Sequence, residues 1–161
     1  LYTLINGAHI YASPNVLPPR FSGEGVKDIN NAEEIYLAYS QLVEEKIVLR
    51  KFNDQYCYDG DTCYVTLNGV NTKIRLLELD TPEISKPKCE AELKLGLKAR
   101  DYLNGLIANA ATIKFKTDYK KDYFGRILAH LIVDGEDVSA KIVSNKLGVV
   151  YDRNNKTDWC T

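Results

Sequence analysis

Residues 58–83 read YDGDTCYVTLNGVNTKIRLLELDTPE, and this stretch decides the fold of the chain. Apolar residues alternate with polar ones on both sides of the dipeptide Asn68-Gly69. Such alternation is typical of half-buried strands, and Asn-Gly is a strong signal for a two-residue turn between antiparallel strands. The stretch therefore predicts a β-hairpin over residues 62–79.

Carboxylates and one arginine accompany this hairpin: Asp59, Asp61, Asp80 and Glu83, with Arg75 between them. Carboxylates that a hairpin brings together at strand ends can supply oxygen ligands for a hard cation. The arginine is not needed to bind a metal, and it suggests a phosphate held beside the metal. Each residue taken singly has an ordinary reading as a turn residue or an ion-pair partner. The hypothesis of a site depends on their occurrence together.

The composition is that of an ordinary globular protein. At 161 residues the chain is long enough for one domain with its own core, and 45% of its residues are hydrophobic and 27% charged. No apolar run approaches the roughly 18 residues of a membrane span, so we expect no membrane partner. No secretory signal is visible. The chain begins at Leu1 and contains no methionine, which leaves both a removed leader and a trimmed start open.

The charge is unevenly distributed along the chain. The formal net charge is only −1, which argues against a general nucleic-acid coat protein. Residues 86–126, however, contain ten basic and five acidic side chains, whereas each remaining segment is net negative. A basic surface beside a carboxylate cluster suits a polyanionic substrate whose phosphate is bridged by a metal. The alternative is a solvated helix face carrying lysines.

The four cysteines are Cys57, Cys63, Cys89 and Cys160, which allow two disulfides in three connectivities. On a continuous strand Cys57 and Cys63 would lie roughly 20 Å apart, so they can pair only if the chain turns sharply at Asp59-Gly60. Disulfides would favour an exported protein, secreted or periplasmic, and free buried thiols are the alternative. No CxxC motif is present, which argues against a zinc site.

Hydrophobic periodicity and turn residues predict the remaining elements. Ile113 and Phe115 are expected to point inward from their strand. The predicted elements are a helix at 31–45, one strand or two short ones at 47–58, a helix at 90–109, strands at 111–118 and 127–133, a helix at 138–147 and a last short strand at 149–151.

These elements predict an α+β protein that is mainly β. Short strands joined by hairpins indicate a small antiparallel barrel with helices outside it. We predict an N-terminal arm and helix at residues 1–46, of unknown role, and a catalytic domain at residues 47–161. The arm itself, residues 1–23, shows no sustained period and is expected to be irregular.

Several motifs in a fixed order resemble the staphylococcal nuclease (thermonuclease) family. They are D-G-D-T from Asp59, K-I-R-L-L around Arg75, L-D-T-P-E ending at Glu83, E-x-x-x-G-x-x-A-R in the helix from Glu92, and D-Y-F-G-R ending at Arg126. The resemblance runs from about residue 48 to residue 159. It implies a five-stranded OB-type Greek-key barrel with about three helices, here preceded by the N-terminal extension.

The resemblance also implies residue roles. Asp61 and Asp80 would ligate Ca²⁺ together with the backbone carbonyl of Thr81. Glu83 would be the general base for the attacking water, and Arg75 and Arg126 would clamp the scissile phosphate. Oxygen ligands without a nearby histidine or thiolate favour Ca²⁺, and arginine forks and a cation stabilise charge on a phosphoryl group.

The loop before Arg126 departs from the family pattern. Tyr123 and Phe124 replace a lysine and a tyrosine, and Phe124 cannot donate a hydrogen bond to a terminal phosphate. Tyr119, Tyr123 and Lys120 lie in the same loop and could substitute. Tyr151 falls near the position of the family's base-stacking tyrosines, and such stacking suits single-stranded or frayed substrates.

By this resemblance the chain is expected to be a monomeric, Ca²⁺-dependent, sugar-nonspecific nuclease. It would hydrolyse DNA and RNA and leave 3′-phosphate ends. The alternative is a non-catalytic nucleic-acid- or protein-binding module on the same barrel, although such modules typically lose the carboxylates and arginines that this chain keeps.

Overall fold

The computed structural model describes residues 3–5, 8–10 and 46–161, and the statements below concern this part of the chain. The chain divides into two compact units, Leu1–Glu45 and Lys46–Thr161, each described by itself.

The N-terminal unit contains a short hairpin where an irregular arm was predicted. Strand β1 (Thr3–Ile5) pairs antiparallel with β2 (Ala8–Ile10). The sequence between the strands is Asn-Gly, the dipeptide that favours two-residue hairpin turns. An analysis of hydrophobic periodicity misses this hairpin because each of its strands has only three residues. The helix predicted at 31–45 lies outside the described residues.

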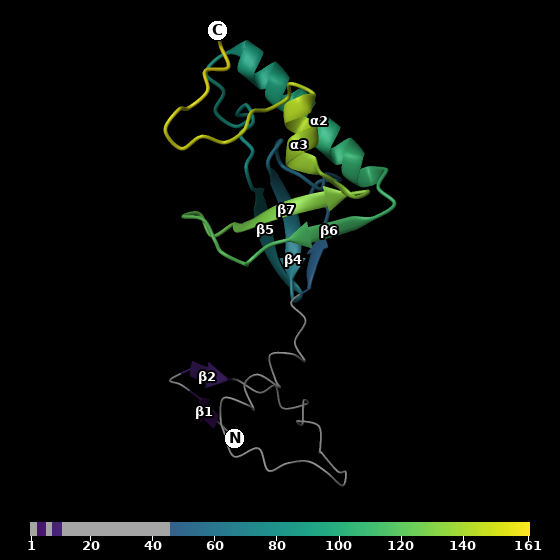
Figure 1. The fold of residues 1–161 in the computed structure, drawn as a ribbon, viewed down its shortest axis with the longest axis vertical. Helices are drawn as coiled ribbons and strands as arrows, with labels where there is room; N and C mark the ends of the chain where they lie inside the picture. Colours follow the sequence, from purple (N-terminus) through teal and green to yellow (C-terminus); the bar gives the residue numbers. More distant parts are fainter. Residues whose placement is uncertain (1–2, 6–7, 11–45) are drawn as a thin grey trace. The chain divides into compact units, whose positions relative to one another are not determined.

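The second unit is built around a strongly curved, nearly closed sheet (Figure 1). Five strands follow one another in the spatial order β3-β4-β5-β7-β6, and a sixth, β8, pairs with β7. This arrangement confirms the predicted five-stranded OB-type barrel. The bounds are β3 (Ile47–Leu49), β4 (Thr62–Leu67), β5 (Val70–Leu76), β6 (Ile113–Lys116), β7 (Ile127–Val133) and β8 (Glu136–Asp137).

One pairing differs from the antiparallel barrel predicted from the hairpins. β4 and β5 form the expected hairpin, but β5 pairs in parallel with β7, so that Arg75 lies opposite Leu128. A parallel neighbour needs a long crossover connection, and the chain between β5 and β7 supplies one because it contains a helix and β6. The pairing sets Arg75, near the end of β5, beside the start of β7, which Arg126 directly precedes.

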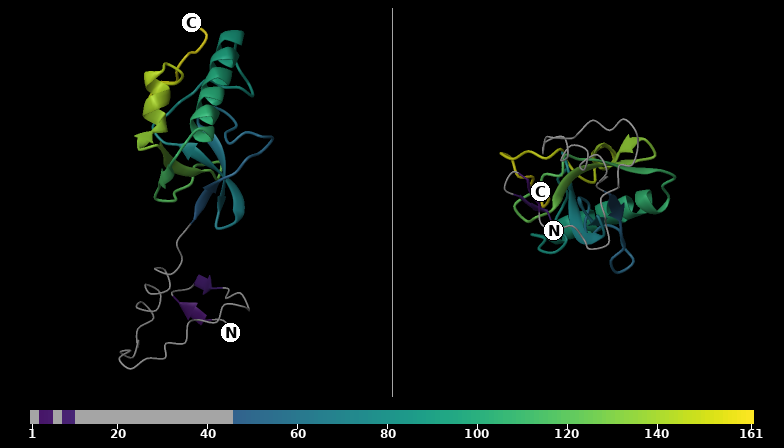
Figure 2. Two further views of the ribbon diagram at one scale, coloured as in Figure 1. Left: turned by 90° about the vertical axis from the view of Figure 1, so that its right-hand side faces the viewer. Right: turned by 90° about the horizontal axis from the view of Figure 1, so that it is seen from below.

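Two helices lie side by side across one end of the barrel in both views (Figures 1 and 2). Helix α2 (Glu90–Ala108) agrees with the prediction and is capped by Cys89, whose Sγ accepts the Glu92 N–H. Helix α3 (Val138–Ser144) is shorter than predicted and is capped by Asp137, whose carboxylate accepts the Ser139 N–H. Residues 46–161 thus contain two helices, against the three expected.

The core fills the space between the barrel and the helices. Its side chains are apolar and are contributed by alternate positions of the strands and one face of α2, as the sequence patterns predict. They include Val65, Ile74, Leu76, Leu79, Leu103, Ile107, Ile127, Ala129, Leu131, Val133, Val138 and Ile142, together with Cys57 and Cys63.

Both disulfides are formed. Cys57 is bonded to Cys63, and Cys89 to Cys160. The first pairing requires the sharp reversal that the sequence left open, and the Tyr58 N–H closes this reversal by donating to the Thr62 carbonyl at 2.9 Å. The second ties the start of α2 to the last residues of the chain.

Three local predictions are wrong in part. The single strand considered for 47–58 is wrong, because β3 ends at Leu49. The alternative of two short strands around Asn53-Asp54 has its break in the right place, since both residues have positive φ in a tight turn, but only isolated bridges follow that turn. The last strand is reduced to a single bridge between Val149 and Asp80. Ile113, the first residue of β6, is 38% exposed instead of buried, whereas Phe115 packs against the core as predicted.

Neither α2 nor α3, the helices that the structure describes, combines the length and the hydrophobicity that a membrane crossing requires.

Candidate active site

Arg75, near the end of β5, contacts several members of a polar network. Its guanidinium lies 3.3 Å from the Asp61 carboxylate and 4.0 Å from that of Asp80. It also donates to the Leu76 carbonyl at 3.0 Å. The side chain is only 15% exposed, so these interactions are partly shielded from water. Such restraints fix the direction of the guanidinium fork.

The loop from Asp59 to Thr62 presents Asp61 to this arginine. The Asp59 carboxylate accepts the backbone N–H groups of Asp61 at 3.0 Å and Thr62 at 2.7 Å, which folds the loop into a tight turn. Asp61 is 7% exposed, and its two oxygens accept the hydroxyls of Thr62 and Thr81. Asp59 therefore stabilises a turn, which was one of the interpretations considered from the sequence.

Gly60 allows this loop to approach the Thr81 segment and helix α2. A Cβ atom at Gly60 would lie 2.7 Å from the Thr81 Cγ2 and 2.9 Å from the Ala99 Cβ, closer than such atoms come in folded proteins. A glycine between the two aspartates is thus required by packing. It lets the Asp61 carboxylate lie against the Thr81 hydroxyl.

The negative charge of Asp61 acts on the carboxylates of both Asp59 and Asp80, and Arg75 offsets only part of its effect on Asp80. Burial and the Asp61 carboxylate raise the pKa of Asp59 to about 7. Burial and Asp61 likewise raise the pKa of Asp80, and the lowering effect of Arg75 does not cancel them. A divalent cation among these oxygens would relieve the repulsion, so the donor set fits a hard metal ion.

The protein side chains alone do not complete such a site. Among the described residues no three His, Cys, Asp or Glu side chains are grouped closely enough to hold a metal ion. Two carboxylates would therefore need a backbone carbonyl and water as further ligands. Oxygen-ligated cations commonly use both.

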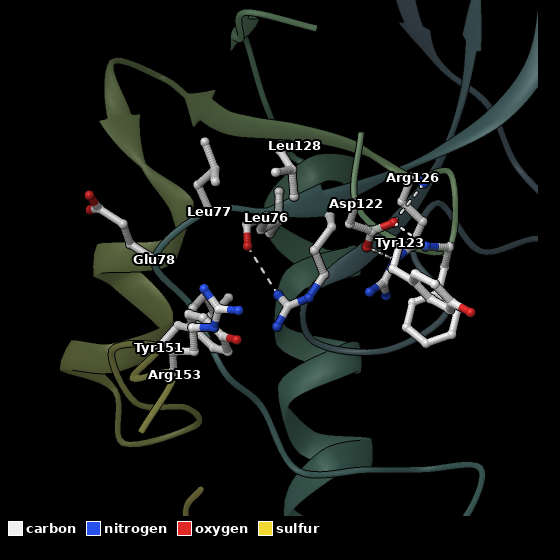
Figure 3. A pocket seen from close by; sticks show the side chains of 12 residues that line it. Leu76, Leu77, Glu78, Asp122, Tyr123, Arg126, Leu128, Tyr151 and Arg153 are labelled. Atoms are coloured by element: carbon white, nitrogen blue, oxygen red, sulfur yellow. Dashed lines mark hydrogen bonds and ion pairs between the residues drawn. The ribbon is translucent and has the colours of Figure 1, made fainter. Parts of the chain in front are cut away.

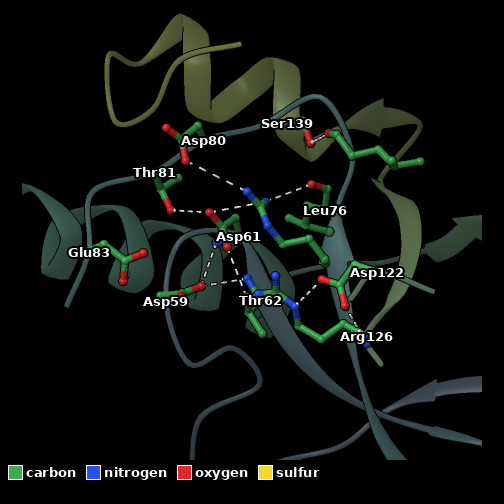
Figure 4. A network of polar contacts seen from close by, with 12 residues as sticks. Asp59, Asp61, Thr62, Leu76, Asp80, Thr81, Glu83, Asp122, Arg126 and Ser139 are labelled. Atoms are coloured by element: carbon green, nitrogen blue, oxygen red, sulfur yellow. Dashed lines mark hydrogen bonds and ion pairs between the residues drawn. The ribbon is translucent and has the colours of Figure 1, made fainter. Parts of the chain in front are cut away.

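Glu83 lies just beyond this network, in the loop that leads to α2. Its side chain is exposed, and Figure 4 places its carboxylate on the Asp59 side of the network. The loop is held by Glu92, which is only 3% exposed. Glu92 accepts the Glu83 N–H at 3.4 Å and the Lys88 N–H at 2.6 Å. These bonds position the Glu83 backbone while leaving its carboxylate accessible.

Arg126 joins the network from the opposite side. Its Nε donates to the Asp122 carboxylate at 2.7 Å, and its Nη1 donates to the Thr62 hydroxyl at 3.0 Å. The Thr62 hydroxyl in turn donates to Asp61, which pairs with Arg75. A continuous series of contacts therefore joins the two arginines that were predicted to share a phosphate (Figure 4).

Asp122 holds the Arg126 side chain in position. Burial would raise the pKa of Asp122, but the backbone N–H and the guanidinium of Arg126, with the Phe124 N–H, lower it below its usual value. The Asp122 carboxylate therefore stays ionised and holds Arg126 through both its backbone and its side chain.

The two arginines line an open pocket of about 640 Å³ (Figure 3). In that view Tyr151 and Arg153 lie on one side of the pocket, and Asp122, Tyr123 and Arg126 on the other. The other lining residues are Arg75, Leu76, Leu77, Glu78, Leu79, Phe124 and Leu128. Guanidinium groups beside apolar and aromatic surface suit a phosphate with an attached base.

The structure sorts the predicted substrate-binding residues into two groups. Tyr123, Phe124 and Tyr151 line the pocket, whereas Tyr119 and Lys120 do not. Tyr123 is 96% exposed, and Phe124 lies 5.4 Å from the Arg126 guanidinium. Lys120 instead pairs with Asp118 at 3.0 Å. The roles of all five as substrate contacts stay predictions.

Sequence reasoning missed four residues of the site. They are Thr62 between the arginines, Asp122 behind Arg126, Glu92 beneath Glu83, and Arg153 in the pocket. Thr62, Glu92 and Asp122 each stand in a motif quoted above, which was the available signal, but those motifs alone assigned them no role. Arg153 reaches the pocket because Val149 exchanges backbone hydrogen bonds with Asp80, a long-range contact that no local pattern shows.

Residues 73–159 match the family described as "Staphylococcal nuclease homologue". The chain belongs to this family. The match covers Arg75, Asp80, Glu83 and Arg126, while Asp59 and Asp61 precede it. Family membership and the barrel agree with the resemblance found in the sequence.

Curated relatives from this family include proteins named as nucleases. The chain is 33% identical over 104 residues to "SPbeta prophage-derived endonuclease YokF" of Bacillus subtilis (strain 168), covering 61% of this chain and 34% of that protein. It is 32% identical over 104 residues to "Endonuclease YncB" of the same strain, covering 61% and 48%. It is 30% identical over 92 residues to "Thermonuclease" of Staphylococcus hyicus, covering 55% and 52%. The chain spans less than two thirds of each relative, and a nuclease-type function is supported.

Proposed function

We propose that this chain is a calcium-dependent phosphodiesterase that hydrolyses both DNA and RNA and leaves 3′-phosphate ends. The observation that carries the proposal is the series of contacts from Arg126 through Thr62 and Asp61 to Arg75, at the edge of a pocket sized for a nucleotide. It couples two guanidinium groups to a cluster of carboxylates.

In this proposal Asp61 and Asp80 hold Ca²⁺ with the Thr81 carbonyl and water. The raised pKa values of Asp59 and Asp80 support the assignment, because carboxylates that repel one another gain from a shared cation. When bound, the cation would supply positive charge beside the phosphoryl oxygens.

The protein groups carry the remaining steps. Arg75 and Arg126 bind the scissile phosphate and stabilise the charge that accumulates on its oxygens. Glu83 orients a water molecule and accepts one of its protons as the water oxygen bonds to phosphorus. The bond from phosphorus to the 5′-oxygen breaks, and this oxygen gains a proton from solvent. The phosphate stays on the 3′-oxygen.

Neither the arginines nor the carboxylates contact a sugar in this proposal, so the enzyme would accept deoxyribose and ribose alike. Stacking on Tyr151 and the exposed ring of Tyr123 would favour single-stranded or frayed regions. We further propose that the enzyme acts as a monomer in an oxidising compartment outside the cytosol, either secreted or periplasmic. The two disulfides support this location.

Digestion of plasmid DNA and of RNA, with Ca²⁺ or with a chelator, tests the proposal. We expect cleavage of both substrates with Ca²⁺, loss of cleavage with the chelator, and 3′-phosphate ends in the products. Glu83→Gln should lower kcat by about a hundredfold or more, because the general base is lost. Glu90→Gln is the matched control, since Glu90 is an exposed carboxylate paired with Lys94 on α2.

Equal turnover by the Glu83→Gln variant and the unaltered protein would contradict the role of Glu83. Binding of nucleic acid without cleavage, unaffected by Ca²⁺, would instead establish the alternative of a non-catalytic binding module.

A further inference from the structure

An aromatic–basic patch lies on β4, β5 and the segment between β3 and β4. We define it as Arg50, Phe52, Tyr58, Tyr64 and Lys73. The rings of Phe52 and Tyr64 lie 5.2 Å apart. The Arg50 guanidinium lies 5.2 Å from the centre of the Tyr64 ring, and the Lys73 ammonium lies 5.6 Å from the same ring. Cations therefore alternate with aromatic rings across this surface.

The patch continues the sheet face that carries the catalytic arginine. Thr62 pairs with Arg75 across β4 and β5, and Tyr64 pairs with Lys73 two residues further along. Side chains two residues apart lie on the same face of a strand, separated by about 7 Å along it. The opposite face, with Cys63, is fully buried in the core. A ligand leaving the Arg75 end of the pocket along this face meets the patch next.

Two of the three rings of the patch are accessible, whereas the Tyr64 ring between Arg50 and Lys73 is only 7% exposed. Phe52 is 51% exposed and Tyr58 is 41% exposed. The Phe52 ring is presented by a tight turn, because Phe52 and Gln55 exchange backbone hydrogen bonds. Rings that are held in place on the surface offer stacking faces without a large loss of side-chain entropy on binding.

The charge of this region is positive. The three basic side chains of Arg50, Lys51 and Lys73 outnumber the two carboxylates nearby, those of Asp54 and Asp59. The Arg50 Nε is buried and has no hydrogen-bond partner within the described residues, whereas its guanidinium carbon faces the ring of Tyr64. Positive charge interleaved with aromatic rings is the arrangement by which proteins bind single strands without reading their sequence.

We propose that the aromatic–basic patch is an accessory site for single-stranded nucleic acid, engaging nucleotides that extend beyond the catalytic pocket. This proposal deepens the proposed nuclease function and rests on it for the path of the strand. Bases stack on Phe52 and Tyr58, and Lys73 and Arg50 approach the phosphates. Long single strands are then bound more tightly than short ones, because only they reach the patch.

The test compares a dinucleotide with a twelve-residue thymidine oligonucleotide, both labelled with a fluorophore. Binding is measured by anisotropy with Ca²⁺ present, in a Glu83→Gln background so that the probes are not cut. The variant is Phe52→Ala with Lys73→Gln. We expect its affinity for the long probe to fall at least about fivefold, since one stacked base is lost. The salt dependence of binding should also weaken by about one phosphate contact.

The dinucleotide should be bound within twofold of the background protein. Ile113→Ala with Lys98→Gln is the matched control, since it removes an exposed apolar residue on β6 and an exposed lysine on α2. Phe52→Tyr with Lys73→Arg should restore tight binding of the long probe. Melting temperatures of all the variants verify that they are folded.

An unchanged affinity for the long probe would overturn the inference, and so would equal losses for both probes. The latter result would mean that the residues act on the pocket. The proposed function fails separately: if the unaltered protein cuts nothing, but the double variant selectively loses the long probe, the accessory site stands and the nuclease does not.

Discussion

At the scale of single residues, the site combines exposed groups with buried ones that hold them in place. Arg126 is fixed by the Asp122 carboxylate, and Glu83 by a backbone bond to Glu92. In the proposed mechanism Arg126 and Glu83 act on the substrate, whereas Asp122 and Glu92 act by holding them in place. Mutations of the two kinds should therefore differ in their effects.

Asp122→Asn should reduce stability in a pH-dependent manner. The folded-state pKa of Asp122 lies below its unfolded value, so its charge stabilises the native state above about pH 4. This contribution is lost as the pH falls through the lower, folded value. The variant should be less stable by about 1–2 kcal/mol at pH 5–8, with the difference vanishing in acid. Urea unfolding at several pH values measures this.

Asp118→Asn is the control, because Asp118 lies in the same loop but is exposed in its pairing with Lys120. It should change stability much less. A difference for Asp122→Asn that persisted unchanged down to pH 2 would show that the charge of Asp122 is not its cause.

Arg153→Ala should weaken substrate binding more than it slows turnover. Arg153 lines the pocket but is exposed and lies across it from Arg126, so its interaction with a phosphate is partly screened by solvent. We expect KM to rise about two- to tenfold with kcat within twofold. Steady-state kinetics on single-stranded DNA measure both. Arg153→Lys keeps the positive charge, so its KM should stay close to that of the unaltered protein. Lys146→Ala, outside the pocket, should leave KM unchanged.

At the scale of elements, the site depends on how closely three segments approach one another. The Asp59–Thr62 loop, the Thr81 segment and helix α2 meet at Gly60. The C-terminal segment is added by the bridge between Asp80 and Val149. If these segments packed less closely, the carboxylates of Asp61 and Asp80 would not be held together beside Arg75.

Gly60→Ala should therefore separate the loop from the Thr81 segment. We expect a loss of stability of about 1–3 kcal/mol from overpacking, together with weaker calcium binding. Gly105→Ala is the matched control, since nothing lies within 4 Å of a Cβ there and alanine favours a helix. Urea unfolding and calcium titration measure the two effects. If a destabilised Gly60→Ala variant bound calcium as tightly as the unaltered protein, the packing at Gly60 would not be what positions the calcium ligands.

At the scale of the whole molecule, two disulfides constrain the barrel unit at very different chain separations. Cys57 and Cys63 are 6 residues apart and enclose the Asp59–Thr62 loop, whereas Cys89 and Cys160 are 71 residues apart. Closing a longer loop removes more entropy from the unfolded chain. The two bonds should therefore contribute unequally to stability.

Replacing Cys89 and Cys160 by alanine should cost about 4 kcal/mol, and replacing Cys57 and Cys63 about 2 kcal/mol, on the chain-entropy estimate. Chemical unfolding of the two double variants under identical conditions measures the difference. The Cys57 and Cys63 variant should show the larger loss of calcium affinity, because that bond closes the loop of Asp61. Equal destabilisation would indicate that chain entropy does not dominate here.

The sequence by itself determined the hairpin, helix α2, the strand at 127–133 and the membership of Arg75, Asp61, Asp80 and Glu83 in one group of motifs. These follow from local period and turn chemistry, which act between neighbouring residues, and from motifs in a fixed order. Periodicity could not detect a three-residue strand such as β1, nor decide where the strand after Lys46 stops.

Only the tertiary structure decided the parallel pairing of β5 with β7, the pairing of the cysteines and the entry of Arg153 into the pocket. It also set Phe52 against Tyr64 in the aromatic–basic patch. Each of these depends on contacts between segments whose local sequences are independent of one another. Their free energy comes from burial and hydrogen bonds formed after the chain has closed on itself, so no local pattern of residues specifies them.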